Sequence, residues 1–149
     1  MNIQNKNIVI TGAANGIGYA LSKRMSEESP KSISLIDIKS SLKEVARSLN
    51  ADSYIVDVSN EHDFQTVLKD IINKNGSIDL FCSNAGIQQF GTLETSTPDW
   101  QKNWDVNVMS HIYAAKVLIP HMKKLGSGYL LLTVSAAGLL NMPGAIAYA

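Results

Sequence analysis

Short apolar runs alternate along the whole chain with stretches in which apolar residues recur at helical spacing. The apolar runs predict five strands, at 7–11, 33–38, 53–58, 78–83 and 129–134. The stretches between them predict helices at about 16–28, 41–49, 60–75 and 97–125. Strands that are almost continuously apolar are typical of parallel strands covered on both faces. The expected fold class is therefore α/β, a doubly wound parallel sheet in one domain spanning residues 1–149.

The helix boundaries carry their own signals. Asn60 is expected to cap the third helix, and Gly76 is expected to end it. The fourth helix is expected to begin with Thr97 as its N-cap and Pro98 at its first position, and to be kinked at Pro120. Residues 60–125 are thus predicted to hold one medium helix and one long helical region.

The charge balance bears on partners and location. The chain has 13 Lys and Arg residues and 13 Asp and Glu residues. This balance gives no reason to expect nucleic acid or an anionic membrane as a partner. No run reaches the ~18 apolar residues needed to span a bilayer. The N-terminus has no signal-peptide pattern, so a cytoplasmic protein is expected.

Thiol and metal chemistry are not expected. Cys82 is the only cysteine, which leaves no partner for an internal disulfide or a cysteine metal cluster. Its place in an apolar run favours a small buried side chain. His62, His111 and His121 match no zinc spacing and are expected on the surface or on helix faces. No metal site is predicted.

A glycine-rich segment, TGAANGIG, follows the first predicted strand directly. Glycines at 12, 16 and 18 allow a sharp turn that brings a helix N-terminus against an anion such as a pyrophosphate. The residues predicted to bind a dinucleotide here are Gly12, Asn15, Gly16, Ile17 and Gly18. The spacing is not the common G-x-G-x-x-G, and a plain strand-to-helix turn is the alternative interpretation.

Asp37, about twenty residues further on, favours the dinucleotide interpretation. It lies near the end of the second predicted strand, where a carboxylate can accept hydrogen bonds from an adenosine ribose. A carboxylate there also repels a 2′-phosphate, and no basic residue lies between Gly12 and Gly16 to attract one. Lys39 lies nearby, and its positive charge weakens the case for NAD slightly. NAD is therefore expected as cofactor, with NADP less favoured.

With these residues in place, the chain resembles the short-chain dehydrogenase/reductase family over nearly all of its length. Thr11 to Gly18 fits the family's TGxxxGxG turn, and the fold implied is Rossmann-like. Four further matches follow in the family's order: Asp57-Val58, which would hold adenine; Asn84-Ala85-Gly86, which would steady the sheet beside the cofactor; Asn107; and the pair Ser135 and Tyr148. Taken one at a time, these residues also have other interpretations: Asp57 could cap a turn, Asn107 could bond a helix carbonyl, and Ser135 could end a strand.

The resemblance implies hydride transfer between a nicotinamide and an alcohol or carbonyl carbon. Tyr148 would exchange the proton on the substrate oxygen, Ser135 would polarise that oxygen, and Asn107 would hold a water that relays protons. An unperturbed tyrosine has a pKa of about 10, far from the pH at which it must work. Family members lower it with a lysine four residues after the tyrosine, which in this numbering falls three residues beyond Ala149.

The sequence is therefore expected to be truncated relative to the family, whose members continue for about a hundred residues within one α/β domain. The strand at 129–134 would then form an edge of the sheet. Two hypotheses remain open: an NAD-dependent oxidoreductase of which these residues are the N-terminal part, and a catalytically inactive nucleotide-binding or interaction protein. The 149-residue chain alone is expected to be inactive or weakly active.

The substrate and the assembly are less constrained. A small-molecule alcohol or carbonyl compound is expected as substrate, and the apolar Leu139, Leu140 and Met142 suggest an uncharged or partly apolar group near Ser135. Trp100 and Trp104, one helical turn apart, are expected to pack. The resemblance also implies a possible homo-oligomer built on the long helical region.

Overall fold

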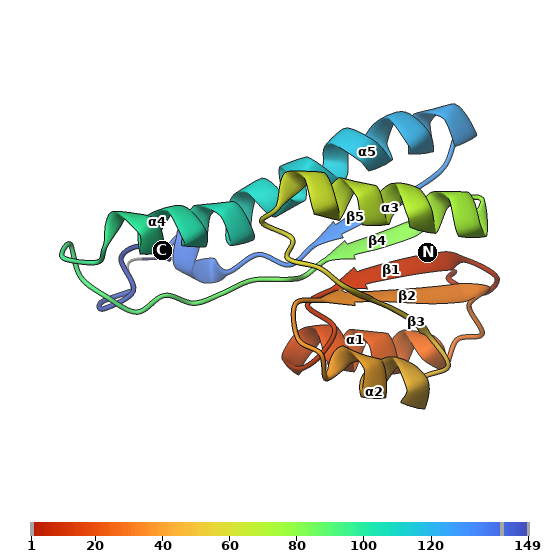
Figure 1. Ribbon diagram of the computed structural model, residues 1–149, viewed down its shortest axis with the longest axis horizontal. Helices are drawn as coiled ribbons and strands as arrows, with labels where there is room; N and C mark the ends of the chain where they lie inside the picture. Colours follow the sequence, from red (N-terminus) through yellow and green to blue (C-terminus); the bar gives the residue numbers. More distant parts are fainter. Residues whose placement is uncertain (1, 141, 149) are drawn as a thin grey trace.

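The computed structural model describes residues 2–140 and 142–148, and within them five parallel strands form one sheet in the order β3-β2-β1-β4-β5 (Figure 1). The strands are β1 (Asn7–Thr11), β2 (Ser32–Asp37), β3 (Asp52–Ile55), β4 (Leu80–Ser83) and β5 (Tyr129–Leu132). The helices are α1 (Gly16–Ser26), α2 (Leu42–Ser48), α3 (Glu61–Asn75), α4 (Thr97–Trp104) and α5 (Ser110–Leu125). A π-helical turn, η1 (Asp105–Met109), joins α4 to α5, and a short 3₁₀ turn, η2 (Ala136–Gly138), follows β5. The predicted doubly wound parallel sheet is confirmed.

The helices cover both faces of the sheet, with α1 and α2 on one side and α3 and α5 on the other (Figure 1). Alternate residues of the central strands divide between two cores. Val9 and Phe81 pack toward α3 and α5, where Phe64 lies 6.4 Å from Phe81 between ring centroids. Ile8 and Ile10 pack in the second cluster with residues of α2. Burial on both faces is the reason that these strands are almost continuously apolar.

The third strand is shorter than predicted. It ends at Ile55 instead of Val58, after which the main-chain N–H of Val56 still donates to the carbonyl of Asp37. Asp57 then turns the chain, because its Oδ1 accepts from both the N–H and the hydroxyl of Ser59, at 2.9 and 2.7 Å. Val58 is buried beyond the strand, so its apolar character extended the prediction.

The long helical region also differs from its prediction at two points. The N-cap of α4 is Ser96, whose Oγ accepts from the N–H of Asp99 at 3.3 Å, and Thr97 is the first helical residue. Pro120 lies inside α5 (Ser110–Leu125), and the kink expected there stays a prediction. Leu118 and Met122, on either side of the proline, are buried against the core. A departure from α-helical geometry that was not predicted lies at Asp105–Met109.

The prediction that Trp100 and Trp104 pack within the chain is wrong. Their exposed fractions are 37% and 54%. The buried residue of α4 is the polar Asn103.

Strand β5 lies at one edge of the sheet, as predicted. Its residues Tyr129, Leu131 and Leu132 are exposed.

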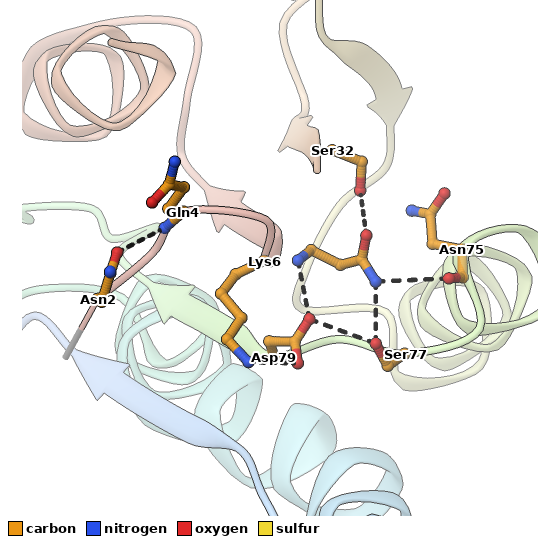
Figure 2. A network of polar contacts seen from close by, with 8 residues as sticks. Asn2, Gln4, Lys6, Ser32, Asn75, Ser77 and Asp79 are labelled. Atoms are coloured by element: carbon orange, nitrogen blue, oxygen red, sulfur yellow. Dashed lines mark hydrogen bonds and ion pairs between the residues drawn. The ribbon is translucent and has the colours of Figure 1, made fainter. Parts of the chain in front are cut away.

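A polar network fastens the amino ends of three strands around Asn7 at the start of β1 (Figure 2). Asn7 is buried, and its Nδ2 donates to Ser77 Oγ at 2.9 Å while its Oδ1 accepts from Ser32 Oγ at 2.9 Å. Its main-chain N–H donates to Asp79 Oδ2 at 2.8 Å, and Lys6 pairs with the same carboxylate at 3.7 Å. The polar groups around Asn7 at this edge of the sheet are therefore paired with one another. The candidate site residues lie at the opposite, carboxyl edge.

Among the described residues, no helix combines the length and the apolar character that crossing a bilayer requires.

Candidate active site

The predicted site residues collect at the carboxyl ends of the strands. Since all five strands are parallel, the segments that follow β1, β4 and β5 leave the sheet at the same edge. The order β3-β2-β1-β4-β5 makes β1 and β4 neighbours from which the chain departs to opposite faces of the sheet. Ligands of open α/β sheets bind at such a switch point.

The glycine turn after β1 has the geometry that an anion site requires. Gly12 and Gly16 have φ of +67° and +55°, in the left-handed region that favours glycine. A Cβ on Gly18 would lie 2.7 Å from Asn84 Nδ2 and closer still to the carbonyl oxygen of Gly12, so only glycine fits. Asn15, at the N-cap of α1, makes no side-chain capping bond, and residues 15–17 are exposed. The first N–H groups of α1 therefore face outward, where an anion can accept from them.

Asp37 is joined directly to this turn. Its Oδ2 accepts from the main-chain N–H of Ala14 at 2.9 Å, and its Oδ1 accepts from the N–H of Lys39 at 3.0 Å. A carboxylate has about four acceptor positions, so two hydrogen bonds leave it able to accept from ribose hydroxyls as well. The end of β2 and the glycine turn thus form one continuous surface.

Asn84, Ala85 and Gly86 follow β4 and are tied to the end of β1. The hydroxyl of Thr11 accepts from the N–H groups of Asn84 and Ala85, both at 2.9 Å. Asn84 Nδ2 donates to the carbonyl of Thr11 at 3.1 Å, and its Oδ1 accepts from Thr133 Oγ1 at 3.0 Å. Asn84 therefore links the segments after β1 and β5 across β4, which steadies the sheet at the site.

Asn107, in the π-helical turn, is clamped to the same segment. Its Oδ1 accepts from the N–H of Ile87 at 2.8 Å, and its Nδ2 donates to the carbonyl of Ile87 at 2.8 Å. A Cβ on Gly86 would lie 3.2 Å from Asn107 Oδ1, a close approach that a larger residue could make only with a small shift of Asn107. The alternative that Asn107 bonds a helix carbonyl is not what the structure shows, since its amide reaches across to the loop after β4.

Two residues near Asn107 had no predicted role in the site. Asn103, 2% exposed, accepts from Asn107 Nδ2 through its Oδ1 at 2.5 Å. His111 lies with Nδ1 2.5 Å from Ser83 Oγ, at the end of β4. Burial lowers the pKa of His111, and a hydrogen bond with the main chain of Asn107 raises it by less. Residues 103, 107 and 111 are spaced by four, so the signal was a shared helix face.

Ser135 and Tyr148 follow β5. Ser135 caps η2, with its Oγ accepting from the N–H of Ala137 at 3.1 Å, and it is exposed. Tyr148 is half-buried, and its N–H donates to the carbonyl of Ala145. Within the described residues, no hydrogen bond joins the side chains of Asn107, Ser135 and Tyr148 to one another. The structure brings Asn107 together with the loop after β4, and places the serine and the tyrosine on a separate, more exposed segment.

That segment contacts the loop between β4 and α4. The N–H of Gly91 donates to the carbonyl of Gly144 at 2.8 Å, which pins the two loops together. An open pocket lies between them, lined by residues 91–94, Met142, Pro143, Gly144 and Ile146. Leu139 and Leu140 are exposed beside it. The lining is mainly apolar, with Glu94 as its one acidic residue.

Cys82 is buried in β4, as predicted, and burial raises the pKa of its thiol to about 12. In the part of the chain that the structure describes, no three His, Cys, Asp or Glu side chains are grouped so that they could hold a metal ion.

Comparison with known proteins identifies the family. The profile described as short chain dehydrogenase matches residues 6–149. Meso-2,3-butanediol dehydrogenase of Serratia marcescens is 34% identical over 152 residues. A crystal structure of NAD⁺-bound xylitol dehydrogenase superposes with a TM-score of 0.91 at 27% identity, and a Burkholderia phymatum family member in complex with NAD does so at 0.92 and 29%. The chain belongs to the short-chain dehydrogenase/reductase family.

The matches cover this chain almost completely but the relatives only in part. They span 99% of this chain in all three comparisons, against 60% of the Serratia enzyme, 60% of the xylitol dehydrogenase and 55% of the Burkholderia protein.

Proposed function

We propose that this protein binds a nicotinamide dinucleotide at the carboxyl edge of its sheet and transfers hydride between that cofactor and an alcohol or carbonyl carbon. The observation that carries the proposal is the hydrogen bond from the N–H of Ala14 to Asp37 Oδ2, at 2.9 Å. It joins an anion-binding turn to a carboxylate that still has acceptor positions free. A dinucleotide is a ligand that carries both a pyrophosphate and ribose hydroxyls.

Each part of the cofactor has residues that would hold it. The N-terminus of α1, with Gly12, Asn15, Gly16, Ile17 and Gly18, would hold the pyrophosphate. Asp37 would accept from the adenosine ribose, and its negative charge beside an exposed turn favours NAD over NADP. Asp57 and Val58 would hold the adenine. Asn84, Ala85 and Gly86 would form the floor of the site.

The bound nicotinamide supplies the carbon that accepts or gives the hydride. In alcohol oxidation the substrate C–H bond would break with its electron pair leaving as hydride, and the hydroxyl proton would pass to the deprotonated oxygen of Tyr148. Ser135 would donate a hydrogen bond to the same substrate oxygen, and Asn107 would hold a water that carries the proton onward. The similar proteins are named for butanediol and xylitol, which makes small secondary alcohols and polyols, or their ketones, the substrates to test first.

Cofactor binding is the first test. Titration with NADH, followed by quenching of Trp fluorescence and by calorimetry, is expected to give saturable one-site binding that is tighter than for NADPH. Asp37→Ala is expected to lower the affinity for NADH and to reduce the difference between the affinities for NADH and NADPH. Asp52→Ala is the matched control, because Asp52 is a carboxylate of the neighbouring strand that pairs with Lys74 at 2.7 Å. No saturable binding of either nucleotide would overturn the proposal.

Turnover separates the two functions that the sequence left open. Binding together with nicotinamide-dependent oxidation of a secondary alcohol identifies an enzyme. Binding without turnover in a polypeptide that carries the lysine after Tyr148 would identify an inactive nucleotide-binding or interaction protein. A polypeptide of residues 1–149 alone is expected to show weak or no turnover, since it would end before the lysine that the resemblance places four residues after Tyr148.

A homo-oligomer stays part of the proposal. Trp100 and Trp104 on α4 and Ile112, Ile119 and Leu125 on α5 are large apolar side chains of this helical region that are exposed. Association through this face would remove them from water. Sedimentation that shows only monomer for wild type, at concentrations well above those of the binding assay, would contradict it. A cytoplasmic location stays a prediction from the sequence, to be checked by cell fractionation.

A further inference from the structure

Asn103 is a buried amide in a helix whose other large side chains face solvent. It is 2% exposed, whereas Trp100 and Trp104 on the same helix are 37% and 54% exposed. Taking an amide out of water costs free energy unless its polar atoms find partners. The contact that Asn103 makes is with one residue of the candidate site, Asn107.

The direction of that contact is fixed by neighbouring main-chain atoms. The N–H of Ile87 can only donate, so the oxygen of Asn107 must face it, at 2.8 Å. Asn107 Nδ2 then faces the carbonyl of Ile87 and the amide of Asn103. Both protons of that nitrogen are used, and Asn103 must present its oxygen. The Nδ2 of Asn103 consequently points away and has no hydrogen-bond partner among the described residues.

The turn that carries Asn107 needs such support. Residues 105–109 are π-helical, a geometry that departs from the i→i−4 ladder of the helices on either side and that is frequent at functional sites. The side-chain bond from Asn107 back to Asn103 spans the junction between α4 and this turn. The pair of bonds between Asn107 and Ile87 then connects the turn to the loop after β4.

We propose that Asn103 is a positioning residue, whose Oδ1 holds the amide of Asn107 in the orientation that clamps the loop at Gly86 and Ile87. This inference rests on the proposed function for its catalytic consequence, since it concerns the same site. Its structural part stands on the hydrogen-bond geometry alone. With an acceptor at residue 103, Asn107 has no freedom to rotate. Without one, a proton of Asn107 Nδ2 is left unpaired in a part-buried place, and the amide can turn away from Ile87.

The test compares two variants of nearly the same size. Asn103→Leu removes the acceptor, and Asn103→Asp keeps an acceptor oxygen facing Asn107 whether its carboxyl group is ionised or protonated. Hydrogen exchange of the Ile87 amide, followed by NMR, is expected to accelerate about 5- to 10-fold in Asn103→Leu, as for the loss of one hydrogen bond. Asn103→Asp is expected to restore the wild-type rate. The amides of Ile8 and Leu80 in the central strands are the control, because general destabilisation would accelerate them too.

Wild type provides a measurement that does not depend on the folding of a variant. Both Nδ2 protons of Asn107, assigned by their loss in Asn107→Asp, are expected to exchange slowly and to show cross-relaxation with Asn103. Fast exchange of these protons, an unchanged Ile87 rate in Asn103→Leu, or equal effects of the leucine and aspartate variants would each overturn the inference.

Kinetics distinguish this inference from the proposed function. In a protein that turns over, Asn103→Leu is expected to lower kcat by up to about 10²-fold through misplacement of Asn107, with little change in the KM for the cofactor. Asn103→Asp is expected to recover most of that loss. If a polypeptide that carries the lysine after Tyr148 shows no nicotinamide-dependent turnover, the enzymatic part of the proposed function fails, and the exchange measurements still decide the role of Asn103. An unchanged kcat in Asn103→Leu would overturn the catalytic part.

Discussion

The hydroxyl oxygen of Thr11 accepts hydrogen bonds from two consecutive main-chain N–H groups, those of Asn84 and Ala85, each at 2.9 Å. It also donates to the carbonyl of Cys82 at 3.4 Å. Thr11 ends β1 and is 1% exposed, so one buried hydroxyl group joins the two strands between which the ligand is proposed to bind. Thr11, the first residue of the TGxxxGxG segment, therefore also holds the loop after β4 in place through hydrogen bonds.

Thr11→Val is expected to destabilise the protein by about 1–3 kcal/mol, because two part-buried N–H groups lose their acceptor while the shape of the side chain is kept. Urea unfolding followed by circular dichroism measures this difference. Thr11→Ser, which keeps the hydroxyl, is the control and is expected to lose far less. Equal stabilities of the valine and serine variants would show that the hydroxyl contributes nothing to this junction.

Gly18→Ala is expected to weaken NADH binding at least tenfold and to destabilise the fold by about 1–3 kcal/mol. Its Cβ would stand against the carbonyl group of Gly12 and against Asn84 Nδ2, and the carbonyl belongs to the backbone of the turn. Gly138→Ala is the control, because nothing lies within 4 Å of a Cβ there. It is expected to change stability by less than about 0.5 kcal/mol. Unimpaired binding by Gly18→Ala would place the anion elsewhere.

The alternation of apolar runs and amphipathic stretches was enough to predict the sheet and its parallel strands, because burial on both faces leaves a plain mark in the sequence. The ends of elements were harder to predict. Val58 is apolar and buried although it lies beyond β3, and hydrophobicity cannot distinguish a buried loop residue from a strand residue. Ser96 and Thr97 are both good capping residues, and only the backbone decides between them.

The candidate site was predictable where its residues follow strands, as Gly12 and Asn84 do. The part of the site on α4 was not predictable, because the amphipathic pattern of this helix predicts that a different face is buried. Trp100 and Trp104 form its apolar stripe but face solvent, while Asn103 is buried. A helical period says which residues share a face, and it does not say which face turns inward. The buried side of α4 carries Asn103, whose Oδ1 accepts a hydrogen bond from Asn107 Nδ2, and no hydrophobicity scale contains such a contact.

His111 is expected to make stability depend on pH between about 5 and 7. Burial lowers its pKa below the ordinary value of 6.5, so the unfolded chain binds a proton there more readily than the folded chain. The contribution of neutral His111 is therefore complete above about pH 6.5 and is lost as the pH falls below that value, with a slope of at most about 1.4 kcal/mol per pH unit. Urea unfolding at a series of pH values measures it.

His111→Gln is expected to flatten this profile, because glutamine keeps a polar contact toward Ser83 without titrating. The control is His62→Gln, since His62 lies on the exposed face of α3. If the slopes of wild type and His111→Gln agree between pH 5 and 7, the imidazole is not the group that titrates.

Cys82 is expected to resist alkylation in the folded protein. Its thiol is buried, with its pKa raised to about 12, so at pH 8 very little thiolate is present and reagents have no access. Intact mass after treatment with iodoacetamide is expected to show no added group under native conditions and one in 6 M guanidinium. Rapid stoichiometric labelling of the native protein would show that β4 opens readily.

The Asn7 network also determines when the sheet can take its final register. Asn7 bonds to Ser32, 25 residues away, and to Ser77 and Asp79, 70 and 72 residues away. During synthesis, β1 and β2 can meet as soon as both have left the ribosome, but the buried amide of Asn7 keeps unpaired atoms until residue 79 has followed. The same holds for the Thr11 hydroxyl and Asn84 at the other end of β1. Hydrogen bonds to residues around β4 thus complete the contacts of β1. A nascent chain released before residue 84 would lack some of these hydrogen bonds at both ends of β1.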